Sequence, residues 1–164
     1  INTTGAKGST PASGVPGLYR TAHNPHLATT NWDWAIDPAG LRLSLRRLNS
    51  RYGLPLLISE NGLGEFDQLL EGDRVADGYR VDYLRQHLQA CQQALGDGVP
   101  LLGYCAWSFT DLLSWLNGYQ KRYGLVYVDR DETDPRQLRR IRKESFFWYQ
   151  RVIASNGGEG LAGG

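Results

Sequence analysis

The sequence predicts an α/β fold built from βα units with parallel strands, and this fold is incomplete within the 164 residues. Two short apolar runs, 54–59 and 101–107, are typical of strands that are buried on both faces of a parallel sheet. Amphipathic helical patterns precede, separate and follow them, which is the order expected of βα units. Two strands close no sheet by themselves, so the remaining strands must come from elsewhere.

The first predicted helix begins at Pro38, because Asp37 can cap it and proline suits the first helical position. Its apolar face consists of Leu41, Leu45, Leu48 and Tyr52. Gly53 ends this helix, and the strand 54–59 follows directly. A polar turn at 60–62 is expected after that strand.

A second helix is expected between Asp77, as its cap, and Gly96, after a loop at 61–76. Its apolar face consists of Leu84, Leu88, Cys91 and Leu95. Pro100 introduces the second buried strand, 101–107. A further strand is predicted within 123–129.

The two ends of the chain have loop compositions. Residues 1–16 are rich in Gly, Ser, Thr and Pro and are expected to form a loop, and 156–164 is expected to be a flexible tail with five glycines. Residues 17–155 are expected to be one part of a single domain, closing with a helix at about 139–154. Ile1 and the absence of methionine indicate a processed product, a trimmed chain or a piece of a longer one.

Charge and composition exclude several functional classes. Eighteen Lys and Arg against 17 Asp and Glu leave a net charge of +1, so no nucleic-acid or membrane partner is expected. No apolar run approaches the ~20 residues of a membrane span. Cys91 and Cys105 lie in apolar segments, which favours buried free thiols in a reducing compartment over a disulfide, and a cytoplasmic location is expected.

Candidate catalytic groups stand where the predicted strands end, because reactive groups in parallel βα folds gather at that edge. Glu60 follows the first strand, and Trp107 with Ser108 ends the second. A carboxylate at a strand end can act as a nucleophile or a base. The spacing alone is equally compatible with an alternative, in which Glu60 only opens a surface turn and has no catalytic role.

The segment Ile58-Ser59-Glu60-Asn61-Gly62 resembles the nucleophile motif of the family-1 glycoside hydrolases, which are retaining enzymes on a (β/α)₈ barrel. Four further segments resemble the family in its order, namely Trp34–Pro38, Trp107–Asp111, Lys121–Asp129 and Ser145–Tyr149. The resemblance covers roughly 17–156 and implies the C-terminal portion of the barrel, with strands seven and eight and their flanking helices. A complete barrel needs at least roughly 200 residues, so the barrel is incomplete as given.

By this resemblance Glu60 is the nucleophile. A retaining glycosidase needs a second carboxyl group ~5–5.5 Å away, which protonates the leaving oxygen. The family carries that group in an Asn-Glu-Pro motif, and this sequence contains none. The missing N-terminal part of the barrel is therefore an expected partner, and the chain alone is not expected to hydrolyse unactivated glycosides.

Ser114, Lys121 and Tyr123 resemble the phosphate-binding set of the 6-phospho-β-glycosidases in the family. Members that act on unphosphorylated sugars carry a glutamate where Ser114 stands. Such a carboxylate would repel a 6-phosphate by ~1 to 4 kcal/mol per charge pair at 4 Å. Each residue also has an alternative interpretation. Lys121 is then an ordinary solvated loop lysine, Tyr123 a core residue and Ser114 a turn-forming residue.

Tryptophans commonly line sugar sites. Trp107 is the candidate floor under the cleaved sugar, and Trp115 resembles a position that contacts the sugar 4-hydroxyl. Trp34 is a candidate for the aglycone side, with a core role equally open. Trp115 resembles the phosphogalactosidases, whereas the 145–156 segment resembles the phosphoglucosidases. The preference between glucosides and galactosides therefore stays open, with glucosides slightly favoured.

The expected function is a retaining 6-phospho-β-glucosidase that acts on a phosphorylated disaccharide or aryl glycoside. No organic cofactor is expected, and no metal, because His23, His26 and His87 lack the spacing of metal ligands. The alternatives are a non-catalytic truncated remnant and a β-glucosidase or β-galactosidase for unphosphorylated sugars.

Overall fold

A computed structural model describes residues 14–15, 18–20 and 24–161 of the chain. It forms two compact units, Ile1–Ile36 and Asp37–Gly164. In the first unit, β1 (Gly14–Val15) pairs antiparallel with β2 (Tyr19–Arg20). Most of the expected loop 1–16 lies outside the described residues, and its two described residues are those of β1.

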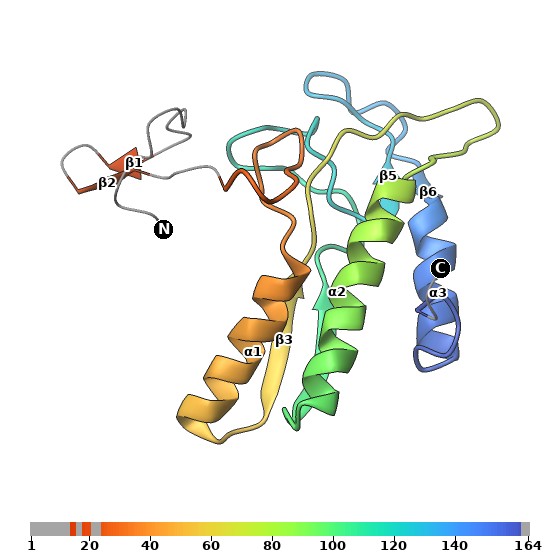
Figure 1. Cartoon of the computed structure of the whole chain (residues 1–164). Coiled ribbons are helices and arrows are strands. Elements are labelled where there is room, and N and C mark those ends of the chain that lie inside the picture. The colour runs from red at the N-terminus through yellow and green to blue at the C-terminus, as the bar shows by residue number, and fades with distance from the viewer. Residues whose placement is uncertain (1–13, 16–17, 21–23, 162–164) are drawn as a thin grey trace. The chain divides into compact units, whose positions relative to one another are not determined.

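The second unit carries the expected α/β order (Figure 1). Its elements are α1 (Pro38–Tyr52), β3 (Leu56–Asn61), α2 (Gly78–Gly96), β4 (Leu101–Ala106), β5 (Val126–Val128), β6 (Arg140–Arg142) and α3 (Glu144–Ala154). β3 and β4 are neighbouring parallel strands, whereas β5 and β6 are antiparallel. α1 and α2 pack against each other, which confirms two βα units side by side.

The ends of α1 are those expected from its sequence. The Asp37 carboxylate accepts a hydrogen bond from the backbone N–H of Gly40 at 2.8 Å, and Pro38 occupies the first turn. Gly53 ends the helix at φ 63°, a left-handed conformation that glycine adopts without strain. The predicted apolar face is wrong at Leu48 and Tyr52, which are exposed.

The second helix has the expected range, but Asp77 does not cap it through its side chain. Its carboxylate instead accepts hydrogen bonds from the backbone N–H and the hydroxyl of Ser145, at 2.9 and 2.5 Å. It also pairs with Arg80 at 2.9 Å. Asp77 therefore joins the start of α2 to the start of α3.

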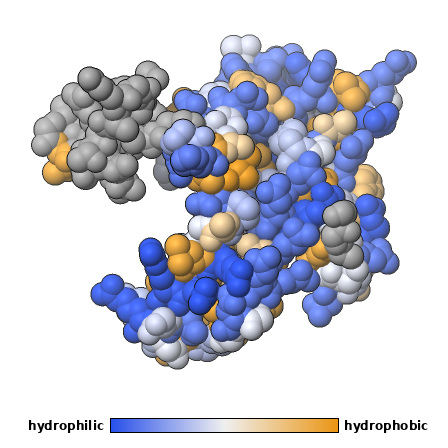
Figure 2. Space-filling view, viewed as in Figure 1, coloured by the Kyte–Doolittle hydropathy of each residue, from blue (hydrophilic) through white to orange (hydrophobic). Residues whose placement is uncertain are grey.

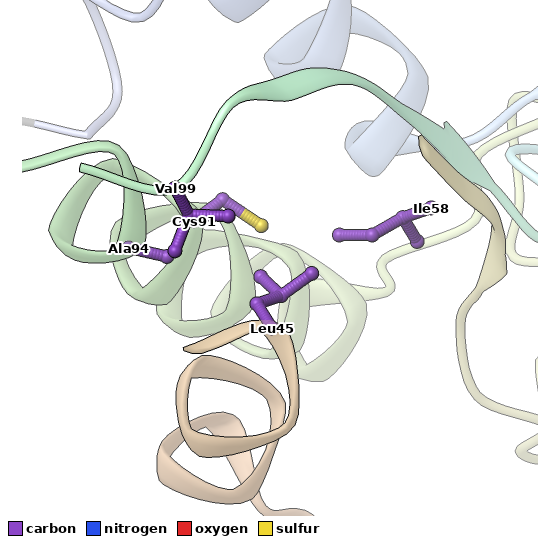
Figure 3. Close-up of a cluster of buried hydrophobic side chains, with 5 residues drawn as sticks. All are labelled: Leu45, Ile58, Cys91, Ala94 and Val99. Carbon is purple, nitrogen blue, oxygen red and sulfur yellow. The ribbon is translucent and has the colours of Figure 1, made fainter. Parts of the chain in front are cut away.

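The core of this unit lies between the helices and the parallel strand pair (Figure 3). Its buried members are Leu45, Ile58, Cys91, Ala94 and Val99. The opposite face of the strands is open, since Leu57 and Cys105 are exposed and Leu102 is 73% exposed. Figure 2 shows hydrophobic residues at the surface among the polar ones.

Two expectations about burial are therefore wrong for this chain. Neither strand is buried on both faces, and only one of the two free thiols, Cys91, is buried. Successive side chains of a strand point to opposite faces, so one face packs on the helices and the other needs a second layer. No described residues supply that layer.

The C-terminal region differs from the single helix expected at 139–154. Residues 140–142 form β6, which pairs with β5, and α3 begins only at Glu144. The expected tail is described as far as Leu161, which is buried. The carbonyl groups of Gly160 and Leu161 accept hydrogen bonds from Arg85 and Gln89 of α2, at 3.2 and 3.0 Å. The tail therefore lies against α2 up to Leu161.

The open strand pair leads to a prediction about the 164-residue chain by itself. β3 and β4 pair only with each other among the named strands, and unpaired strand edges with exposed apolar side chains promote association. We expect the purified chain to aggregate or to bind the dye ANS, with no sharp thermal transition in circular dichroism. A monomer in size-exclusion chromatography with a cooperative melt would contradict this.

Candidate active site

Glu60 and Trp107 stand at the neighbouring carboxyl ends of β3 and β4. Asn61 is in register with Ala106, and the backbone N–H of Trp107 donates to the carbonyl of Asn61 at 2.8 Å. Glu60 is an exposed residue within β3, so the strand extends further than 54–59 and the turn starts later than expected. Glu60 therefore stands at a hydrogen-bonded strand end.

The chain segments that follow β3 and β4 approach each other closely at Gly62. A Cβ atom at this position would lie 1.8 Å from the carbonyl oxygen of Trp107, so no other residue fits without moving the backbone. The Trp107–Ser108 peptide bond is cis. This close approach fixes the backbone of Trp107, which is 37% exposed, beside the end of β3.

Asn61 is held by a hydroxyl group of the neighbouring strand. The Tyr104 hydroxyl donates to the Asn61 side-chain oxygen at 2.6 Å. Burial is the main cause that raises the pKa of Tyr104, with nearby Tyr83 adding to it, so this hydroxyl keeps its proton at neutral pH. The residue next to Glu60 is thereby fixed in orientation.

Ser114, Lys121 and Tyr123 form a compact buried group, called here the clamp. The Tyr123 hydroxyl lies 3.1 Å from Ser114 Oγ, and Lys121 Nζ lies 5.6 Å from the centroid of the Tyr123 ring. Lys121 is only 2% exposed, so the alternative of a solvated loop lysine does not apply. Burial lowers the pKa of Lys121, and the charge of Glu65 opposes this shift.

The clamp is attached to the ends of both strands. The backbone N–H of Ser108 donates to the carbonyl of Tyr123 at 3.1 Å. Arg122 and Glu65 exchange two backbone hydrogen bonds of 2.8 and 2.9 Å. The segment 121–123 therefore lies between the chain that leaves β3 and the chain that leaves β4, on the same edge as Glu60.

Ser114 also has the turn-forming role that was its alternative. It exchanges two backbone hydrogen bonds of 3.0 Å with Gly118, which close the turn that precedes Lys121. The Glu132 carboxylate accepts from the backbone N–H groups of Tyr119 and Gln120, at 2.5 and 3.0 Å. These contacts fix the loop that carries the clamp.

A buried set of charges behind the clamp was missed by sequence reasoning. It consists of Asp67, Asp77, Arg80, Asp111, Arg122 and Lys143. Arg80 donates through Nη1 to the carbonyl oxygens of Leu63 and Tyr123, at 3.0 Å each. One guanidinium thus ties the segment after β3 to the clamp.

Asp111 is a second centre of this set. Its carboxylate accepts from Lys143 Nζ at 2.7 Å and from the backbone N–H of Gly124 at 2.9 Å, and it faces Arg122 at 3.5 Å. Burial, and secondarily the charge of Arg80, lowers the pKa of Lys143, which Asp111 and Asp67 oppose. In the sequence Asp111 stood out only as the last residue of the family segment Trp107–Asp111, three residues after Ser108, and the buried Lys143 had no sequence signal.

The other two predicted tryptophans, Trp115 and Trp34, lie in different units of the chain. Trp115 is 98% exposed on the turn that starts at Ser114. Trp34 belongs to the unit Ile1–Ile36, where its carbonyl accepts from the backbone N–H of Thr30 at 2.9 Å. The structure thus places Glu60 and Trp107 at neighbouring strand ends and brings the three clamp residues together, while the functional roles of all these residues stay predictions.

The described part of the chain contains no candidate metal centre. Within 14–15, 18–20 and 24–161, no three His, Cys, Asp or Glu side chains are grouped so that they could hold a metal ion. No helix in these same ranges has the length and hydropathy needed to cross a membrane.

Comparison with known proteins assigns the family. The sequence matches glycosyl hydrolase family 1 over residues 3–158. The chain belongs to this family. Solved structures of the family-1 β-glucosidase of Thermotoga maritima, one of them with castanospermine, superpose with a TM-score of 0.79 at 36% identity, covering 88% of this chain and 32% of theirs. The chain therefore forms part of a (β/α)₈ barrel, which confirms the predicted fold.

Relatives of known function in the family include enzymes named for phosphorylated substrates. Aryl-phospho-beta-D-glucosidase BglC of Bacillus subtilis is 63% identical over 157 residues, which are 96% of this chain and 33% of that protein. The 6-phospho-beta-glucosidase AscB of Escherichia coli is 44% identical, over 88% of this chain and 31% of its own length. The phospho-cellobiase of Klebsiella oxytoca is 49% identical, over 82% and 29%. The chain thus spans about a third of the length of these relatives.

Proposed function

We propose that this chain supplies the nucleophile and the phosphate site of a retaining 6-phospho-β-glucosidase. Glu60 attacks the anomeric carbon of the sugar and forms a glycosyl ester, which water then hydrolyses. The carboxylic acid that protonates the leaving oxygen comes from the remainder of the barrel, because the sequence lacks an Asn-Glu-Pro motif. The substrate is a phosphorylated disaccharide or aryl glycoside.

The convergence of the clamp residues is the observation that carries this proposal. Two hydroxyl groups 3.1 Å apart and a buried ammonium group 5.6 Å from the Tyr123 ring centroid lie within one loop system beside the strand ends. Charge-assisted hydrogen bonds from such donors are the strong ones for a phosphate group. A glutamate in place of Ser114 would bring a carboxylate against Tyr123 and oppose an anionic ligand.

A preference for 6-phospho-β-glucosides over 6-phospho-β-galactosides is part of the proposal. Relatives named as phospho-β-glucosidases match at 44–63% identity, whereas the 6-phospho-beta-galactosidase of Clostridium acetobutylicum matches at 40%. A cytoplasmic location is also proposed. Both cysteines are free thiols, which suits a reducing compartment.

The test uses a completed enzyme, defined as the Bacillus subtilis relative in which this chain replaces the third that it matches. Lys121→Met removes the ammonium charge and keeps a stem of similar length. We expect KM for p-nitrophenyl β-D-glucoside 6-phosphate to rise by roughly 10- to 100-fold, because a hydrogen bond to a charged group is worth about 1.5–3 kcal/mol. The unphosphorylated glucoside, assayed side by side, should lose little.

Arg47→Met is the matched control, since it removes an exposed cation from α1. It should leave both KM values unchanged. An equal loss on the two substrates in the Lys121 variant would contradict the phosphate site. Efficient hydrolysis of the unphosphorylated glucoside by the unmodified completed enzyme would instead favour a plain β-glucosidase.

A further inference from the structure

Gly64 lies directly against two of the clamp side chains. A Cβ atom at Gly64 would be 2.4 Å from Lys121 Cε, 2.7 Å from Lys121 Cγ and 2.8 Å from Tyr123 Cε1. Carbon atoms in contact normally stand about 3.5–4.0 Å apart. Even a methyl group at position 64 would therefore displace at least one of the two side chains.

Backbone conformation does not explain this glycine. Gly53 and Gly118 have φ values of 63°, where other residues are strained, but Gly64 is not among the glycines with positive φ. A Cβ atom at Gly78 or Gly96 would meet nothing within 4 Å, whereas Gly64 is buried. The reason for glycine at 64 is the close approach of the clamp.

The surroundings leave little room for adjustment. Arg80 binds the carbonyl oxygens of both Leu63 and Tyr123, so the backbone on each side of the contact is held by one guanidinium. Tyr123 is further held through its hydroxyl by Ser114. The part that can yield is the stem of Lys121, and its displacement would move the ammonium group from its place over the Tyr123 ring.

We infer that Gly64 is a specificity-determining residue for the phosphate group. Because it has no side chain, it leaves free the space that Lys121 and Tyr123 occupy. This inference rests on the proposed function and adds to it a residue that touches no substrate. Gly64 acts through Lys121 and Tyr123, so it is a positioning residue. A side chain at 64 would weaken phosphate binding and leave the nucleophile at Glu60 in place.

Gly64→Ala in the completed enzyme tests the inference. We expect KM for p-nitrophenyl β-D-glucoside 6-phosphate to rise at least about tenfold, with a much smaller change in kcat. The inhibition constant of glucose 6-phosphate should rise in parallel, while that of glucose should not. Gly96→Ala is the control, because a Cβ there meets nothing within 4 Å, and it should change none of these constants.

A double-mutant comparison separates this role from a general structural one. If Gly64 acts through Lys121, Gly64→Ala should add almost nothing to KM in the Lys121→Met background. Equal effects of Gly64→Ala in both backgrounds would overturn the inference, as would a fall in kcat as large as the rise in KM. Thermal melting of each variant shows whether the fold is kept.

The two proposals fail in different ways. If the unmodified completed enzyme prefers the phosphorylated glucoside and Gly64→Ala leaves KM unchanged, the inference about Gly64 is wrong and the proposed function stands. If the unmodified enzyme shows no preference for the phosphorylated glucoside, the proposed function is wrong and the inference falls with it.

Discussion

Replacing Glu60 with glutamine in the completed enzyme is expected to lower kcat by at least ~10³-fold, the scale on which loss of a catalytic nucleophile acts. Glutamine has nearly the same size as glutamate, but its neutral amide is a far weaker nucleophile towards the anomeric carbon. Within this chain Glu60 is exposed at the end of β3, so the change removes no contact buried by the described residues. The KM for phosphorylated substrate and the melting temperature should change little.

The measurement is release of p-nitrophenolate from the phosphorylated aryl glucoside, together with the inhibition constant of glucose 6-phosphate as a measure of binding. Glu71→Gln is the matched control, because Glu71 is an exposed loop glutamate in the same connection between β3 and α2. It should keep full activity. A Glu60→Gln variant that retained more than a tenth of the activity would exclude Glu60 as the nucleophile.

Replacing Asp111 with alanine is expected to lower the free energy of unfolding of the completed enzyme by about 3–5 kcal/mol, because it breaks a buried ion pair on one side. The change removes the acceptor for the backbone N–H of Gly124. It also takes a carboxylate from Lys143 and from Arg122, which both remain buried. Uncompensated buried charge is costly, so this loss exceeds that of any surface pair.

Asp82→Ala is the control for this experiment. Asp82 also pairs with an arginine, Arg85, at 2.6 Å, but it is exposed on α2, where such pairs contribute about 0–1 kcal/mol. Denaturant and thermal unfolding of the two variants should be compared under the same conditions. An Asp111 variant no less stable than the Asp82 variant would show that the buried network does not support the fold.

Several features followed from local sequence alone because their causes are local. The start and end of α1 depend on the side chain of Asp37, the ring of Pro38 and the freedom of Gly53, and all three act as expected. The order of two strands and their helices follows from apolar spacing, and the strand-end position of Glu60 follows from that order. The family motifs added the choice of Ser114, Lys121 and Tyr123, which the structure brings together.

Other features depended on which segments pack together, which no local pattern contains. The sequence predicted Asp77 as a helix cap. Once α2 and α3 are packed, its carboxylate instead binds Ser145 and Arg80. The apolar faces of the strands looked buried, but Leu102 and Cys105 are exposed because their second layer lies outside this chain.

The sequence by itself determined the family, the two strand ends and the chemical groups that stand there, because these are carried by contiguous motifs. The tertiary structure alone decided that Arg80, Asp111 and Lys143 are buried together, and that Gly64 faces Lys121 and Tyr123. Burial of charge and close approach of side chains are properties of residues far apart in the chain. They arise only when the connections after β3 and β4 are folded against each other.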